Sequence, residues 1–417
     1  MNRLRFACVV LVTLAVASSF ASVRAQDLLI KDARVVTCAG KEHAIANVLI
    51  KGGRIAAIGR DVKGDGVPEL QARGKTVMPG FVLAHSWLGL DSRNRNEMID
   101  VTPYLSVLDA IDPSLPFYED CLRDGHLTIC VMPGNSAAIA GMGRIVRPWG
   151  ATVEAMTVDA EPGLKISMIP RTGRGNRAAW VAKIRKEFEA AKRAVSDAER
   201  DSKKEATGNV GFDLEAMGVK KRQLSMTRLL KGDLRAHIAC ATAGDVVQAM
   251  KLIRDYDLKA VLVCSSGTWR AAKHIAKSKL PVVLTGALTF RDQDMDTGKE
   301  IERNLPKIFS DAGVRFALMT STGSLGSRYA WYQAACLVRY GMSREDALAA
   351  VTRIPAEIIG VGERKGSIVV GKDADLIVLT DDPLSGRAWV DQGVIGGRVV
   401  YERSKDPRLA EIFGGGR

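Results

Sequence analysis

A single histidine, His85, follows an apolar run in the stretch Met78-Pro79-Gly80-Phe81-Val82-Leu83-Ala84-His85-Ser86-Trp87-Leu88-Gly89. This stretch separates two kinds of sequence. Before it, residues 27–78 contain short apolar runs separated by turn signals such as Gly52-Gly53, a pattern typical of β-hairpins. After it, short apolar runs alternate with helical periods. The stretch therefore marks the boundary between a β-rich segment and an alternating segment.

The alternating segment predicts βα units and a parallel sheet. About 280 residues of this pattern suit a (β/α)8 barrel. A long polar helix is expected over residues 187–204, led by a stripe of Trp180, Ile184, Phe188 and Ala191 that predicts a packing face. Residues 201–219 are expected to form a surface loop. The strand candidates are residues 129–132, 234–240, 260–264, 281–284 and 316–319, and the helix candidates are 246–256, 269–277 and 344–353.

The carboxyl-terminal part again has hairpin patterns. Short apolar runs over 366–370 and 376–379 precede a second glycine pair, Gly396-Gly397, inside the run 394–401. Neither end of the chain has enough strands to bury a core alone. We therefore expect the two β-rich ends to pack together as one small domain.

The first 25 residues have the features of a secretory signal. Arg3 and Arg5 precede an apolar run from Phe6 to Val16, and Val23-Arg24-Ala25 supplies small residues before a cleavage site at Ala25. The apolar run is shorter than the roughly 18 residues of a membrane span. The residue directly after the cleavage site is Gln26 and not a cysteine, so a lipid anchor is not expected. The sequence predicts export to the periplasm or the extracellular space, without a membrane anchor.

Composition and cysteine usage narrow the function classes. The formal net charge is +13, with much of the excess in residues 171–231, but few aromatic residues interleave with these charges. We therefore predict no nucleic-acid binding. Six cysteines follow the signal, an even number that permits disulfides in an exported protein. Most lie in apolar stretches, which favours free buried thiols.

Several motifs resemble the amidohydrolase superfamily. Its metal-binding signature reads apolar-Pro-Gly-Phe-apolar-Asp-Ala-His-x-His-x-Gly, and here Leu83 replaces the Asp and Trp87 replaces the second His. Residues 339–347, 353–361, 365–368 and 371–376 are similar to the family's closing segments. Gly141-Met142-Gly143, with residues 152–156, resembles the imidazolonepropionase-like branch.

The resemblance implies an α/β fold in which a (β/α)8 barrel over residues 79–357 is joined to a small β-sandwich. Residues 26–78 and 358–405 form that composite sandwich, and 406–417 form a tail. The family places metal ligands on the first, fifth, sixth and eighth barrel strands. The matching positions are His85, Ala239 or His237, Ser266 with Cys264 as a rival, and Ser321.

These substitutions leave two hypotheses open. A catalytic zinc usually needs three protein ligands and a water, and the family's general base falls on Ser321, which lacks a carboxylate. The first hypothesis is a non-hydrolytic binding or scaffold member with a degenerate metal site, in which Trp87 fills the metal cavity. The second is a hydrolase of non-peptide or cyclic C–N bonds that uses a metal site rebuilt from His85, His237 and Cys264.

The competing interpretations of His237 and Cys264 are a satisfied barrel histidine and a small buried thiol. The expected cofactor is none, or a single weakly bound zinc. The expected partner is a small molecule that the sequence does not identify, with a homo-oligomer or pairing with an active homologue as further expectations.

Overall fold

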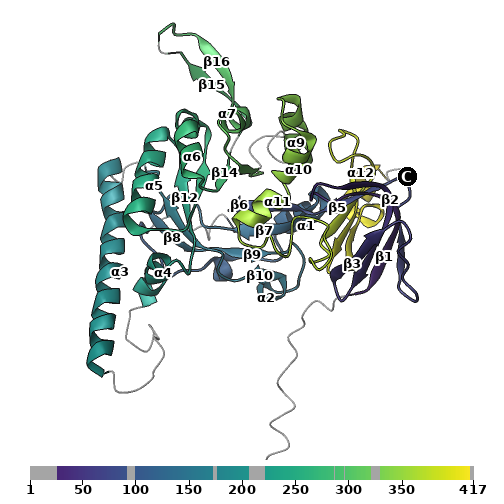
Figure 1. The fold of residues 1–417 in the computed structure, drawn as a ribbon, viewed down its shortest axis with the longest axis horizontal. Helices are drawn as coiled ribbons and strands as arrows, with labels where there is room; N and C mark the ends of the chain where they lie inside the picture. The colour runs from purple at the N-terminus through teal and green to yellow at the C-terminus, as the bar shows by residue number, and fades with distance from the viewer. Residues whose placement is uncertain are drawn as a thin grey trace, which may run out of the picture.

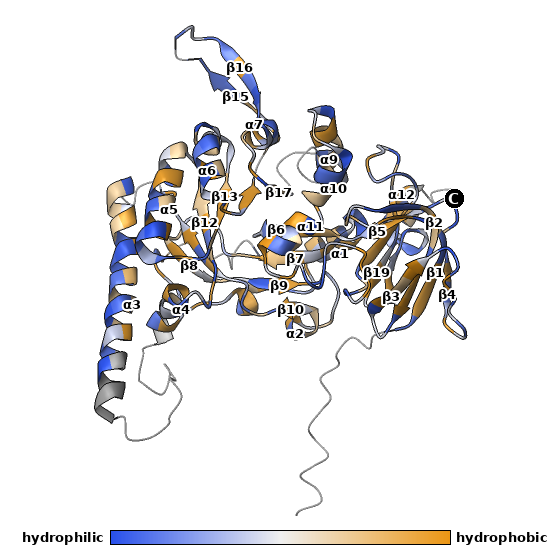
Figure 2. Ribbon diagram, in the orientation of Figure 1, coloured by the Kyte–Doolittle hydropathy of each residue, from blue (hydrophilic) through white to orange (hydrophobic). Residues whose placement is uncertain are grey.

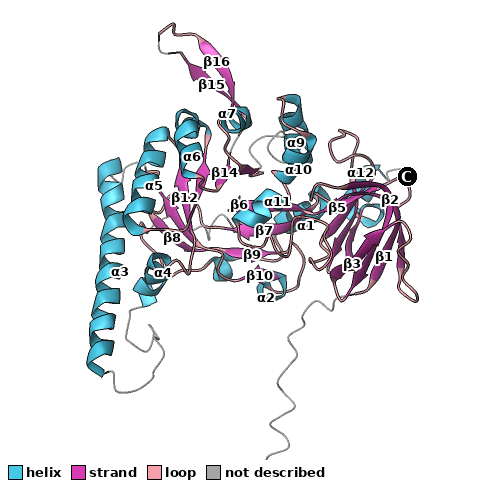
Figure 3. Cartoon of the chain, in the orientation of Figure 1, coloured by secondary structure: helices cyan, strands magenta, loops and turns pink. Residues whose placement is uncertain are grey.

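The computed structural model describes residues 26–91, 99–171, 176–205, 221–285, 287–294, 296–320 and 329–413 of the 417-residue chain. The described chain is a mixed α/β fold, as the sequence predicts (Figure 1). A β-rich part, built from both ends of the chain, lies beside a larger part in which helices flank the strands (Figure 3). The expected signal sequence over residues 1–25 lies outside the described residues, and within them no helix combines the length and apolar character needed to cross a membrane.

The two ends of the chain share one eight-stranded sheet. Its main path runs β20-β19-β18-β5-β1-β2-β3, and β4 pairs with β1. The ends meet where β5 lies parallel to β1 and antiparallel to β18. These strands are β1 Leu28–Val36, β2 Glu42–Lys51, β3 Arg54–Gly59, β4 Glu69–Gln71, β5 Thr76–Pro79, β18 Leu376–Leu379, β19 Val390–Ile395 and β20 Arg398–Glu402.

Apolar side chains from both ends form one core in this sheet. Ile30 and Val35 from β1 gather with Val48 from β2 and Val378 from β18, all of them buried. Ile30 and Val35 are five residues apart, and the irregular pairing of β1 with β2 between them brings both side chains into the same core. The expected sandwich is thus a single continuous sheet in the described residues, and its core depends on both ends of the chain.

The middle of the chain forms two further sheets and a hairpin. The sheet orders are β10-β9-β7-β6 and β17-β14-β13-β12-β11-β8, and strands β11, β12, β13, β14 and β17 are parallel neighbours. The strands are β6 Phe81–Ser86, β7 His126–Val131, β8 Ile139–Met142, β9 Arg144–Val146, β10 Thr157–Asp159, β11 Leu164–Ser167, β12 Ala236–Cys240, β13 Ala260–Cys264, β14 Val282–Leu284, β15 Thr289–Gln293, β16 Glu300–Asn304 and β17 Phe316–Leu318.

Helices cover these strands with amphipathic faces. The predicted stripe of Trp180, Ile184, Phe188 and Ala191 is fully buried on α3, while most of this helix is hydrophilic (Figure 2). The α-helices are α1 Pro116–Asp124, α2 Val153–Met156, α3 Arg177–Glu205, α4 Lys221–Leu230, α5 Ala243–Tyr256, α6 Ala272–Ser278, α7 Leu305–Asp311, α9 Ala330–Arg339, α10 Arg344–Ala349, α11 Arg353–Ile358 and α12 Pro407–Phe413. The 3-10 helices are η2 Val107–Ala110, η3 Ser266–Ala271 and η4 Arg403–Lys405.

Two segments differ from the sequence-based expectations. The expected loop over 201–219 begins inside α3, and its later residues lie outside the described part. The hairpin of β15 and β16 projects from the body (Figure 1) and was not predicted, because its strands are mostly polar. The expected tail contains α12, whose neighbour Asp406 receives a hydrogen bond of 2.7 Å from Arg123.

A buried charge network connects the terminal sheet to the middle of the chain. Arg147, just after β9, donates to Asp375 at 3.0 Å and to Asp373 at 3.2 Å. The ammonium group of Lys365, which is 2% exposed, also contacts Asp375 and lies 3.4 Å from Asp373. Buried charges are tolerated only when they are paired in this way. The network therefore holds residues just before β18 against the strands that follow β7.

Candidate functional site

The predicted residues His85, His237, Ala239 and Cys264 lie on strands β6, β12 and β13, and Lys165 on β11 lies beside them. Register places Lys165 of β11 opposite His237 of β12, and His237 opposite Val261 of β13. Residues paired in this way point to the same face of a sheet. We call this the inner face, because Val261 and Val263 join the buried cluster that contains Val82 and Ala84 of β6. Lys165 and His237 therefore both project from the inner face.

Cys264 lies on the opposite face of the same sheet. It is paired in register with Cys240, and both belong to the cluster that packs against helix residues such as Val246 and Ile275. Burial raises the pKa of the Cys264 thiol to about 12, so it is a neutral thiol at pH 7. Cys240, the register partner of Cys264, lies three residues after His237 on β12. Residues an odd number of positions apart on a strand point to opposite faces of the sheet. The structure therefore does not bring Cys264 together with His237. The rebuilt ligand set proposed from the sequence is not assembled in this structure.

His85 reaches the inner face through an irregularity in β6. Leu83 pairs with Ile129 and Ser86 pairs with Val131. Between these two pairs β6 advances by three residues, whereas β7 advances by two. The extra residue is a β-bulge, which interrupts the alternation and redirects side chains. Leu83 packs in a separate cluster with Ile129, whereas His85 extends to Lys165. In a regular strand, His85 would point to the same face as Leu83, two residues before it. The bulge explains why the two side chains point in different directions.

Lys165 and His85 form the central contact of the site. Lys165 Nζ lies 2.6 Å from His85 Nε2, and neither residue has any exposed surface. A distance this short between two nitrogens requires that one donates a proton to the other. With the ammonium as donor, His85 Nε2 accepts and His85 carries its own proton on Nδ1. The nitrogen of His85 that faces the inner side is therefore already engaged.

His237 is fully buried beside the start of β11. Its ring packs against Gly163, just before β11, where an added Cβ would fall 2.7 Å from His237 Cδ2. Only glycine leaves room for this imidazole. Ala239 is the next inner-facing residue toward the carboxyl end of β12, where chemistry is found in barrel enzymes. His237 therefore lies two residues before Ala239 on the same face, and the resemblance places the family's ligand on either residue.

Both imidazoles are held neutral. Burial is the main cause that lowers the pKa of His237 to about 3, and the charge of Lys165 lowers it further. The Pro162 carbonyl opposes part of this change but makes no hydrogen bond of normal geometry. Burial and Lys165 also hold the pKa of His85 well below its usual value of 6.5. Within the described residues, His85 Nδ1 and both ring nitrogens of His237 are buried without a hydrogen-bond partner.

The other predicted positions surround this cluster. Trp87 is half-buried, packs against the inner cluster, and meets the His85 ring edge-on at 5.8 Å between centroids. Ala239 is buried, and Ser266 begins η3 directly after β13. Ser321 lies outside the described residues. All six cysteines beyond the expected signal are free, as predicted for most of them.

These residues do not fit an ordinary catalytic zinc site. In the described ranges, no group of three His, Cys, Asp or Glu side chains converges as metal ligands. Such a site needs three ligands, whereas here His85 contacts an ammonium group and Cys264 lies on the opposite face of the sheet from His237. A buried ammonium also repels a divalent cation.

Sequence reasoning missed Lys165. The signal that could have found it is a lone lysine in the otherwise apolar or small-residue run 164–169, which is buried throughout β11. A buried lysine in a strand is rare enough to mark a site.

Comparison with known proteins gives the same class as the fold. Residues 312–401 match the model of the amidohydrolase family. The crystal structure of an amidohydrolase from Thermotoga maritima superposes with a TM-score of 0.78 and 26% identity, covering 90% of this chain and all of that one. An adenosine deaminase from Xanthomonas campestris with bound zinc shares the fold at a TM-score of 0.51 and 16% identity, covering 93% of this chain and 96% of that one.

Curated relatives are more distant. Amidohydrolase tasK of Hapsidospora irregularis is 22% identical over 406 residues, which cover 83% of this chain and 39% of that protein. An imidazolonepropionase of Thermoplasma volcanium is 31% identical over 114 residues, covering 25% of this chain and 28% of that protein. The chain spans well under two thirds of the length of these relatives.

Fold and comparisons together define the class: an α/β protein with the architecture of amidohydrolases. More particularly, residues 312–401 are similar to the amidohydrolase family model, and the described fold is similar to that of the Thermotoga maritima amidohydrolase.

Proposed function

We propose that this protein is a non-hydrolytic member of the amidohydrolase family, which binds a small molecule or serves as a scaffold. The observation that carries the proposal is the 2.6 Å contact between Lys165 Nζ and His85 Nε2. This contact brings a basic nitrogen against the histidine that matches the family signature, which supports a site not built for a catalytic metal. The finer resemblance to the imidazolonepropionase-like branch rests on Gly141-Met142-Gly143 and on one short match.

The site also lacks a suitable proton acceptor for hydrolysis in its described part. General-base catalysis is most effective when the pKa of the base lies near the working pH. His237, with a pKa of about 3, is too weak a base to activate water at pH 7. Leu83 and Ala239 supply no polar atom where the family uses ligands. The inner face is therefore better suited to holding a ligand than to cleaving one.

The runner-up function is hydrolysis of cyclic or non-peptide C–N bonds with a reduced metal site. It is favoured by one observation, the three buried ring nitrogens of His85 and His237 without hydrogen-bond partners. Orphaned buried nitrogens are costly unless something binds them. A single weakly held zinc is the cofactor that this alternative requires.

The proposal includes the architecture and the location. The parallel neighbours β11 to β14 and β17, with β6 and β7, support a (β/α)8 barrel over residues 79–357. The shared terminal sheet supports a composite domain of residues 26–78 and 358–405. The basic start and apolar run of residues 1–25 support export, which amino-terminal sequencing of secreted protein would test by locating Gln26.

Metal analysis tests the two functions against each other. Protein purified without added metal should contain well under one zinc per chain, and it should not hydrolyse a panel of cyclic amides with or without added zinc. Stoichiometric zinc that resists a chelator, together with hydrolysis that the chelator abolishes, would replace the binding function with the hydrolytic one. Calorimetric titration with zinc completes the test by measuring any weak site.

A further inference from the structure

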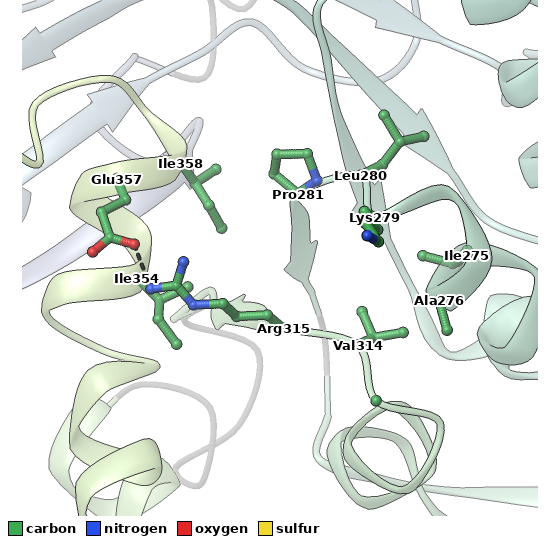
Figure 4. Close-up of a pocket in the computed structure, with 11 residues that line it drawn as sticks. Ile275, Ala276, Lys279, Leu280, Pro281, Val314, Arg315, Ile354, Glu357 and Ile358 are labelled. Carbon is green, nitrogen blue, oxygen red and sulfur yellow. Dashed lines mark hydrogen bonds and ion pairs between the residues drawn. The ribbon is translucent and has the colours of Figure 1, made fainter.

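A cleft of about 400 Å3 lies where strands β14 and β17 begin, outside the cluster around His85. One wall is α11 and the other is α6 with the turn that follows it, and Arg315 reaches between them (Figure 4). This volume falls within the range of small-molecule sites. The apolar lining residues are Ile275, Leu280, Pro281, Val314, Ile354 and Ile358.

The polar groups at this cleft carry an excess of positive charge. Lys279 is exposed at one edge, and the Arg315 guanidinium donates to the Glu357 carboxylate. Arg353 also lies 3.6 Å from Glu357, so one carboxylate is shared by two guanidinium groups. The Arg315 side chain is 55% exposed, so solvent and solutes reach its guanidinium. Two cations, Lys279 and Arg315, and one anion, Glu357, line this apolar cleft, and the carboxylate is shared with Arg353 outside the lining, so the cleft favours a ligand with a negative head group.

The backbone of Lys279 is a second observation that points to its side chain. Lys279 follows α6 in the left-handed conformation, with φ of 55° and an amide that donates to Ala276. Gly313 follows α7 in the equivalent turn, with φ of 79° and an amide that donates to Ser310. Glycine adopts this conformation without cost, whereas lysine does so at a cost. The chain thus has a strained lysine at the cleft where the next βα unit has a relaxed glycine.

We propose that this cleft binds a small amphiphilic anion. Its apolar body lies between α6 and α11, and its carboxylate or phosphate head group lies between Lys279 and Arg315. Glu357 competes with the head group for Arg315 in the empty cleft. The proposal does not rest on the function proposed for the inner face.

Calorimetry with three probes of equal chain length tests the proposal: octanoate, octyl phosphate and octanol. Octanoate or octyl phosphate should bind more tightly than octanol, and added salt should reduce the difference. The stronger of the two anions identifies the head group. Equal binding of octanol and the anions, or no binding of either anion at millimolar concentration, would overturn the proposal.

Three variants with opposite expected signs sharpen the test. Lys279→Gly should weaken octanoate binding roughly three- to fivefold, while the thermal midpoint stays equal or rises because the turn relaxes. Arg315→Gln should weaken binding by a similar factor, and Glu357→Gln should strengthen it. A Lys279→Gly protein that folds normally and binds octanoate unchanged would refute the site. A concentration-dependent dimer that covers the cleft and excludes octanoate would assign it to a second copy and refute it as well.

Discussion

The two neutral imidazoles at the inner face should make stability depend on pH in the histidine range. The folded-state pKa of His237 is about 3, against about 6.5 for the unfolded chain. Below pH 6.5 the unfolded state therefore binds a proton that the folded state does not. The contribution of the neutral imidazole to the unfolding free energy is fully present above about pH 7 and is lost as the pH falls toward 3. The direction is opposite to that of a histidine that gains an acidic partner.

The size of the effect follows from these values. Between pH 7.5 and 5.5, one histidine with a pKa of about 3 contributes a loss of about 1.3 kcal/mol in unfolding free energy. The pKa of His85 is lowered in the same direction, so His85 adds to this loss. The wild-type protein should therefore lose more than about 1.3 kcal/mol from these two groups. His237→Gln should lose about 1.3 kcal/mol less than the wild type over the same interval.

Urea unfolding of chelator-treated protein at both pH values measures this difference. The test compares the pH-dependent loss in each protein, so a change in absolute stability caused by the substitution does not affect it. His274→Gln, on the exposed surface of α6, is the matched control and should keep the wild-type loss. If His237→Gln loses as much stability as the wild type, the imidazole is not held neutral and the reasoning about the buried cluster fails.

Two further predictions concern the charge network and the lost ligands. Asp375→Asn should lower the unfolding free energy by about 3 kcal/mol, because it leaves Lys365 buried with a weakened partner set. In the same urea assay, Asp311→Asn, which removes an exposed helix pair with Lys307, should cost no more than about 0.5 kcal/mol. A quadruple variant restores the family's ligand types: Trp87→His, Ala239→His, Ser266→His and Ser321→Asp. It should bind zinc in a calorimetric titration, although replacing Trp87 costs about 3 kcal/mol if this residue is core-packed. A quadruple variant that folds and binds no zinc would show that the four side chains do not converge on one point.

The fold was largely accessible from hydrophobic patterning. The predicted strand over residues 260–264 coincides with β13, and the predicted helix over 246–256 lies within α5. Thr242 and Asp245 form a capping box that starts α5 three residues earlier than the apolar pattern suggested. The hairpin β15–β16 and the short strands β8 to β10 escaped prediction, because they are too short or too polar to show a period of two.

The site was less accessible, because it depends on long-range geometry. The sequence indicates that Leu83 and Trp87 replace family ligands, but it does not indicate which face Cys264 occupies. That face is set by the register of β12 against β13, which pairs Cys240 with Cys264. The bulge in β6 likewise follows from pairing with β7 and not from local composition. Pairing register moves side chains between faces in one-residue steps, so residue type alone did not identify Lys165.

Lys165 separates the two functions proposed for the inner face, and its replacement by methionine tests both. The ammonium contacts His85 Nε2 at 2.6 Å, and its charge lowers the pKa of both His85 and His237. Methionine fills a similar volume without charge, so Lys165→Met should raise both histidine pKa values and free Nε2 for a metal. If the lysine excludes metal, zinc affinity measured by calorimetry should rise in Lys165→Met, and the histidine resonances should titrate at higher pH. If the lysine instead helps to hold a metal in a reduced site, zinc affinity should fall while the histidine resonances still shift. The sign of the zinc effect therefore decides whether this lysine replaced the metal or supports it.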